Sequence, residues 1–84
     1  MHETSELMKS ATKSRKIFAS QVKKHRQAKG WRLEDLHQAS GLSYNYLSTV
    51  ENGRANISLD NADAIAKALG VPLAVLLIDQ QSEE

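Results

Sequence analysis

The hydrophobic residues of this chain recur at intervals of three and four, which places side chains on one face of an α-helix. This pattern predicts helices over residues 14–29, 33–40, 44–51 and 59–69. A single proline, four glycines and little β-branched alternation also favour an all-α fold. The side chains expected on the buried faces are Phe18, Val22, His25, Leu33, Leu36, Leu47, Val50, Leu59, Ala62, Ile65, Ala66 and Leu69.

Glycines and serines mark where these helices end and begin. Gly30, Gly41 and Gly70 each follow a predicted helix, at the position where a left-handed backbone commonly ends one. Ser43 and Ser58 each precede a predicted helix as its N-cap. Two short helices joined at a steep angle by a glycine turn form a helix-turn-helix, which we expect over residues 33–52.

The segment after Gly70 is apolar on every side. Pro72 can open a fifth helix there, and the apolar residues extend to Ile78. Such a helix leaves one face uncovered on a small domain, and a second copy of the same surface would cover it. The alternative is burial within the chain itself. We expect a two-fold homodimer with an interface formed by Val71, Leu73, Leu76, Leu77 and Ile78.

Length and composition limit the class of protein. A chain of 84 residues, 40% of them hydrophobic, corresponds to one domain with a small core. We expect an N-terminal arm or helical extension at 1–13, a helix-turn-helix domain at 14–79 and a polar tail at 80–84. The sequence has no cysteine, no run long enough to span a membrane and no secretory signal, so we expect a cytoplasmic protein.

Charge is distributed unevenly along the chain. Residues 7–33 contain nine Lys or Arg and no Asp or Glu, whereas residues 34–84 contain two basic and eight acidic residues. A basic segment of this kind favours a polyanionic partner, although a solvated basic helix explains the same pattern.

The sequence contains no set of residues that predicts catalysis. No nucleophile has a base and an orienting group at a recognisable spacing, and there is no glycine-rich phosphate loop. We therefore expect no enzyme activity, no cofactor and no metal. His25 and His37 lie on helices that would pack together and could form a metal or pH-sensing pair. Without an evident third ligand, we interpret them as partly buried, hydrogen-bonded residues.

Several short motifs occur in a fixed order over residues 18–77. They are Arg26 four residues before Gly30, Leu36, Gly41-Leu42-Ser43, Tyr46-Leu47-Ser48, Val50-Glu51-Asn52-Gly53-Arg54 and Ile65-Ala66-Lys67-Ala68-Leu69-Gly70-Val71. Together these motifs resemble the xenobiotic-response-element-type helix-turn-helix family, which includes phage Cro and repressor DNA-binding domains. The run over residues 54–59, together with the short length, is similar to the restriction-modification controller subgroup.

The resemblance implies a five-helix bundle of the phage-repressor type, whose recognition helix at 43–51 enters the major groove. It also implies a buried ion pair between Arg26 and Glu51. An outward asparagine can pair with adenine and an outward threonine methyl can contact thymine. The expected base contacts are Ser43, Tyr44, Asn45, Ser48 and Thr49. The expected phosphate contacts are Arg32, the backbone N–H of Leu33, Asn52, Arg54 and Asn56.

The chain departs from the family pattern at four positions. Leu33 stands where a phosphate-bonding glutamine is common, and Arg32 stands where Ser or Thr usually caps the helix. His25 replaces a core leucine, and His37 replaces a small alanine where two helices cross closely.

The resemblance implies a transcriptional regulator that binds a near-palindromic operator in double-stranded DNA as a homodimer. The alternative is an antitoxin-like protein-interaction module that keeps the bundle without specific DNA binding. The acidic second half of the chain and Leu33 favour the alternative. The scarcity of acids around Tyr44 favours DNA binding.

Overall fold

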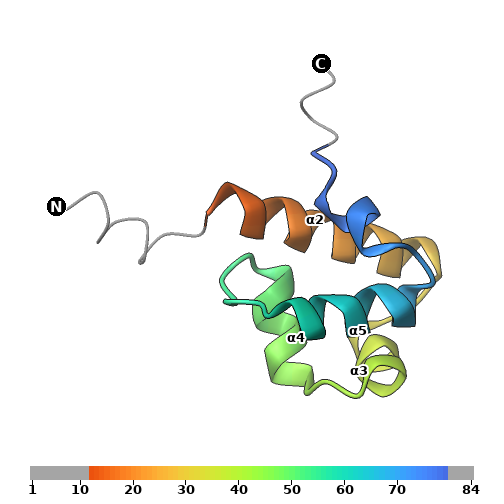
Figure 1. The fold of residues 1–84 in the computed structure, drawn as a ribbon. Helices are drawn as coiled ribbons and strands as arrows, with labels where there is room; N and C mark the ends of the chain where they lie inside the picture. The colour runs from red at the N-terminus through yellow and green to blue at the C-terminus, as the bar shows by residue number, and fades with distance from the viewer. Residues whose placement is uncertain (1–11, 80–84) are drawn as a thin grey trace, which may run out of the picture.

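A computed structural model describes residues 12–79 of the protein. Within that range the chain forms four α-helices and one 3₁₀-helix, and no strand (Figure 1). All four predicted α-helices are confirmed to within one residue. Residues 1–11 of the expected N-terminal arm and the whole of the expected tail at 80–84 lie outside the described residues. The elements are α2 (Lys13–Ala28), α3 (Leu33–Ser40), α4 (Tyr44–Glu51), α5 (Leu59–Leu69) and η1 (Leu73–Leu77).

Side-chain caps fix the starts of these helices. The hydroxyls of Ser43 and Ser58 accept hydrogen bonds from the backbone N–H groups three residues on, at 3.1 and 3.0 Å, as expected for N-caps. Arg32 has no acceptor atom with which to cap α3. Its own backbone N–H instead donates to the Asp35 carboxylate at 2.8 Å, which is one half of a capping box. The start of α3 is therefore held despite the missing Ser or Thr.

The core lies where all the helices meet. α2 packs against α4, α5 and η1, while α3 packs against α4 and α5. Trp31 folds back against this core, half-buried, between α2 and α3. Burial of one large aliphatic side chain contributes about 1.5–3 kcal/mol to stability, so the fully buried residues supply most of the driving force. These are Val22, Leu36, Leu47, Val50, Ile65 and Leu76.

The prediction of a fifth α-helix is wrong. Residues 73–77 form a 3₁₀-helix, with the Val75 N–H donating to the Pro72 carbonyl at 3.0 Å. A helical run of only five residues commonly takes this tighter 3₁₀ form. The chain is already extended again at Ile78.

Two predicted side-chain placements also need correction. Leu76 was expected in a dimer interface, but it is completely buried in the core of its own chain. Leu59 was expected in the core, but it is 76% exposed. Leu59 is the first residue of α5, and the buried side chains of that helix begin one turn later, at Ala62. For the C-terminal segment, the alternative to a dimer interface was burial within the chain itself. That alternative is correct for Leu76.

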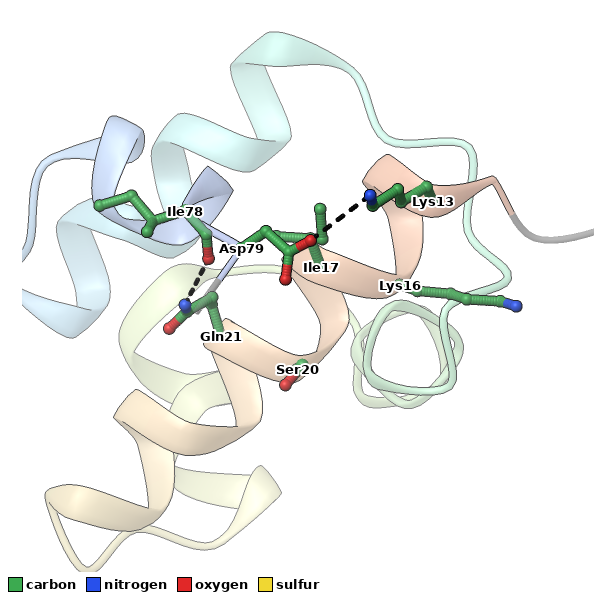
Figure 2. Close-up of a pocket in the computed structure, with 7 residues that line it drawn as sticks. All are labelled: Lys13, Lys16, Ile17, Ser20, Gln21, Ile78 and Asp79. Carbon is green, nitrogen blue, oxygen red and sulfur yellow. Dashed lines mark hydrogen bonds and ion pairs between the residues drawn. The ribbon is translucent and has the colours of Figure 1, made fainter. Parts of the chain in front are cut away.

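The segment after η1 is held against α2 by two polar contacts (Figure 2). The buried amide of Gln21 donates through Nε2 to the Ile78 carbonyl at 2.6 Å, and Lys13 Nζ lies 3.6 Å from the Asp79 carboxylate. An open pocket of about 460 Å³ lies between α2 and this segment. Gln21 Oε1 is buried without a hydrogen-bond partner among the described residues, so only the nitrogen of that amide binds the segment.

Candidate nucleic-acid interface

The two faces of α4 have different environments. Leu47 and Val50 are completely buried, whereas Tyr44, Asn45 and Thr49 are exposed. Ser43, just before the helix, is also exposed, and Ser48 is half-buried. The residues predicted to contact bases therefore lie on the side of α4 that faces away from the core.

The polar groups on the outer face of α4 differ in how free they are to bind DNA. The Asn45 amide is exposed and can present one donor and one acceptor, the pairing that adenine offers in the major groove. The Thr49 hydroxyl donates to the Asn45 carbonyl at 3.0 Å, so Thr49 offers mainly its methyl group. The Ser43 hydroxyl accepts from the Tyr46 N–H and still has its own hydrogen to donate.

The turn before α4 is braced by hydrogen bonds. Gly41 has φ +79°, the left-handed conformation that was expected to end α3. His37 Nδ1 donates to the Leu42 carbonyl at 2.6 Å, and the Ser40 hydroxyl accepts from the Leu42 N–H at 3.2 Å. The interpretation of His37 as a partly buried, hydrogen-bonded residue is confirmed. Within residues 12–79 there is no cluster of three or more metal-ligating side chains around it or elsewhere.

Two further contacts fix the position of α4 relative to its neighbours. At one side, Asn61 Nδ2 of α5 donates to the Tyr46 hydroxyl at 3.2 Å. At the other, Arg26 of α2 and Glu51 form the expected ion pair, with Nε–Oε2 at 2.7 Å and Nη2–Oε1 at 3.0 Å. Arg26 Nη1 also donates to the Trp31 carbonyl at 2.7 Å. α4 is therefore attached to both α2 and α5.

The Arg26–Glu51 pair is largely withdrawn from solvent. The two side chains are only 11% and 8% exposed. Hydrogen bonding to the Glu51 carboxylate raises the pKa of Arg26, although burial opposes the shift. Glu51 is the only acid from residue 43 to residue 59, and it points inward to this arginine. The outer face of α4 consequently has no carboxylate of its own.

The residues predicted to bind phosphate lie in two segments, the start of α3 and the loop after α4. Arg32 and the Leu33 backbone lie at the start of α3, where the first N–H groups have no partner within the helix. Asn52, Arg54 and Asn56 lie in the loop between α4 and α5, and their side chains are exposed. Two acids, Glu34 and Asp35, share the first turn of α3, so the loop after α4 is the more positive of the two segments.

A lysine on α2 also belongs to this surface, and sequence reasoning missed it. Lys16 lies against Gly53, and Gly53 is the residue that follows the C-cap of α4. Lys16 belongs to the basic segment 7–33, but its contact with this loop could not be predicted from the sequence, because α2 and the loop meet only through the tertiary fold.

Comparisons with known proteins agree with this geometry. The Helix-turn-helix family model matches residues 22–76 of the chain. A hypothetical transcription factor of Neisseria meningitidis serogroup B is 40% identical over 67 residues, covering 80% of this chain and 63% of that protein. The control protein C.MunI from a Mycoplasma species is 37% identical over 71 residues, covering 79% of this chain and 90% of that protein. The chain spans only 46% of a Deinococcus deserti regulator and 63% of the Neisseria protein.

Solved structures of similar proteins also match the fold of this chain. The crystal structure of the hypothetical transcription factor NHTF from Neisseria has a TM-score of 0.80 at 36% identity, covering 88% of this chain and 85% of that one. The restriction-modification controller protein C.Esp1396I, a tetramer in complex with its natural 35-base-pair operator, has a TM-score of 0.72 at 29% identity. That match covers 77% of this chain and 86% of the other. None of the helices described between residues 12 and 79 has the length and hydrophobicity of a transmembrane span.

Proposed function

We propose, since this chain belongs to the helix-turn-helix family of DNA-binding transcriptional regulators, that it recognises a specific operator by placing α4 in the major groove. The observation that carries the proposal is the outer face of α4, which is exposed, uncharged and held by fixed contacts on both sides. The major groove is wide enough to admit a helix. The protein would then act in the same compartment as the DNA that it binds, which we propose is the cytoplasm.

Base recognition would come from the first half of α4. Asn45 is the strongest candidate, because its amide is free to form two hydrogen bonds with adenine. Thr49 would contribute a thymine-methyl contact, because its hydroxyl is already bonded within the helix. Tyr44 is 47% exposed at the first turn and would contact either a base methyl or a phosphate. The hydroxyls of Ser43 and Ser48 would add hydrogen bonds to base edges that carry either a donor or an acceptor.

Phosphate contacts would set the position of α4 over the bases. Arg54 carries the positive charge of the loop after α4, with Asn52 and Asn56 on either side. At the other end, the Leu33 backbone N–H and the Arg32 side chain would hold a phosphate at the start of α3. Arg32 also offsets the nearby acids of that helix, so we expect a weaker contact here than at Arg54.

The protein would bind as a homodimer. Leu77 and Ile78 are 51% and 48% exposed, and Val71 and Leu73 are half-buried against the core in the same segment of the chain. A two-fold pairing of this apolar surface would cover it and place two copies of α4 on successive turns of one DNA face, about 10 base pairs or a multiple apart. The C.Esp1396I tetramer on its operator supports an assembly of more than one subunit on DNA.

Selection of binding sites from random duplex DNA, followed by titration of variants, tests this function. Asn45→Ala should relax discrimination at one base position by about 1–3 kcal/mol. Arg54→Ala should weaken binding to all sequences and lower its salt dependence. Equal losses on selected and random duplex for Asn45→Ala would exclude base recognition by this residue. Failure of the wild-type protein to enrich any sequence would instead favour a protein-interaction module.

The dimer has a separate test in sedimentation equilibrium. Leu77→Asp places a charge in the proposed interface at an exposed position, so it should give a folded monomer. A variant that keeps the wild-type mass would remove this surface from the interface.

A further inference from the structure

We propose that Lys16 is an additional DNA phosphate contact, which extends the phosphate-binding edge from the loop after α4 onto α2. This inference rests on the proposed binding of DNA through α4. It adds a residue on a different helix, outside the helix-turn-helix itself.

The position of Lys16 comes from the packing of α2 against the end of the recognition helix. A Cβ placed on Gly53 would lie 3.7 Å from Lys16 Cγ and 3.8 Å from Lys16 Cα. The stem of Lys16 therefore lies directly over the loop, next to the residue that precedes Arg54. A DNA backbone close enough to contact Arg54 would also come within reach of the long lysine side chain.

The charge of Lys16 is available for such a contact. Lys16 is exposed, and no carboxylate among the described residues lies within ion-pair distance of it. Figure 2 shows its ammonium group extending away from Asp79, whereas the ammonium group of Lys13 turns toward that carboxylate. The acid nearest to this loop in the sequence, Glu51, is bound to Arg26. Lys16 and Arg54 thus form a short positive edge without a competing local acid.

The chemistry favours a phosphate over a base. A lysine ammonium is a compact charge on a flexible stem and binds phosphate oxygens without requiring a fixed orientation. Lys16 also lies outside α4, the element proposed to enter the groove. Its contribution should therefore be independent of DNA sequence and should depend strongly on salt.

The experiment measures the affinity of Lys16→Gln for the selected duplex and for a random duplex from 50 to 200 mM salt. Loss of one phosphate contact lowers the slope of log K against log salt by about 0.9. The affinity advantage of the wild type should therefore shrink by about 3.5-fold across this salt range, equally on both duplexes. Lys16→Arg, which keeps the charge, should restore the wild-type slope.

Lys67→Gln is the matched control. Lys67 is an exposed lysine near the end of α5, two turns beyond the loop, where it pairs with Asp63 across one helical turn. Its removal changes net charge by the same amount and should leave the slope unchanged. An equal slope change in both variants would mean that only net charge matters and would overturn the proposal.

The remaining outcomes separate this inference from the function on which it rests. An unchanged slope in Lys16→Gln, with a reduced slope in Arg54→Gln, would reject Lys16 as a contact and leave DNA binding intact. A loss confined to the selected duplex would also reject a phosphate contact. Absence of duplex binding by the wild-type protein would overturn both proposals. Thermal unfolding of each variant checks that the fold is retained.

Discussion

Removal of the Glu51 carboxylate should strongly destabilise the protein. Glu51→Ala takes away two of the three hydrogen bonds to the Arg26 guanidinium and leaves only the Trp31 carbonyl as a partner. Arg26 cannot lose its charge at ordinary pH and is 11% exposed, so it would remain as an uncompensated cation. Breaking such a buried pair typically costs about 3–5 kcal/mol.

This loss is large for a domain of this size. A stability of about 0.05–0.15 kcal/mol per residue gives roughly 4–13 kcal/mol for the whole chain. At about 4–8 °C per kcal/mol, Glu51→Ala should lower Tm by at least about 12 °C. Urea unfolding followed by circular dichroism should give a lower midpoint with an unchanged slope, because the surface exposed on unfolding is nearly the same.

Two matched variants show whether burial is the cause. Asp63→Ala breaks the exposed Lys67–Asp63 pair, whose side chains are 79% and 56% exposed, and should cost about 0.5 kcal/mol or less. Replacing both partners of the buried pair, as Arg26→Met with Glu51→Leu, should recover most of the loss. If Glu51→Ala costs no more than Asp63→Ala, the reasoning from burial is refuted.

Three further predictions concern individual features of the fold. Gly53→Ala should cost about 1–2 kcal/mol in unfolding free energy, because φ is +77° while the new Cβ would meet Lys16 only at ordinary contact distance; no loss in a urea titration would contradict the strain. Ser43→Ala should cost about 1 kcal/mol through loss of the cap on the Tyr46 N–H, and Ser43→Asp should retain stability in the same titration. Because Glu51 raises the pKa of Arg26 in the folded protein, the ion pair contributes to the free energy of unfolding in full at any pH below the ordinary pKa of arginine. That contribution is lost only as the pH rises above this value. The difference in unfolding free energy between wild type and Arg26→Gln should stay constant from pH 7 to 10. A difference that changes with pH in this range would contradict the predicted direction of the pKa shift.

Local signals were sufficient to predict the α-helices. The periodicity of Leu36, Leu47 and Val50, together with Gly41 and the Ser43 cap, is local information that needs no knowledge of the tertiary fold. Burial of one side of α4 then determines which side chains point outward, so this half of the candidate site could also be predicted.

The features that were missed depend on contacts between distant segments. Gln21 is polar and therefore resembles a surface residue, yet it is buried because the C-terminal segment returns to α2 and accepts its hydrogen bond. Leu76 and Leu77 are identical neighbours, and only the docking of η1 determines that the first is buried and the second exposed. Lys16 joins the candidate interface for the same reason, through Gly53.

The attachment of η1 links local order to assembly. The apolar residues proposed for the dimer lie on or beside a five-residue 3₁₀-helix that has little stability of its own. This segment is held by the buried Leu76, the Gln21–Ile78 hydrogen bond and the Lys13–Asp79 pair. If the segment is docked on α2 in only a fraction of the molecules, only those molecules can pair. The apparent affinity of the dimer is then the intrinsic affinity multiplied by that fraction once for each subunit. Gln21→Ala removes the hydrogen bond to the Ile78 backbone carbonyl but leaves every apolar side chain of the proposed interface in place. It should therefore raise the protein concentration at which the paired DNA-binding helices assemble.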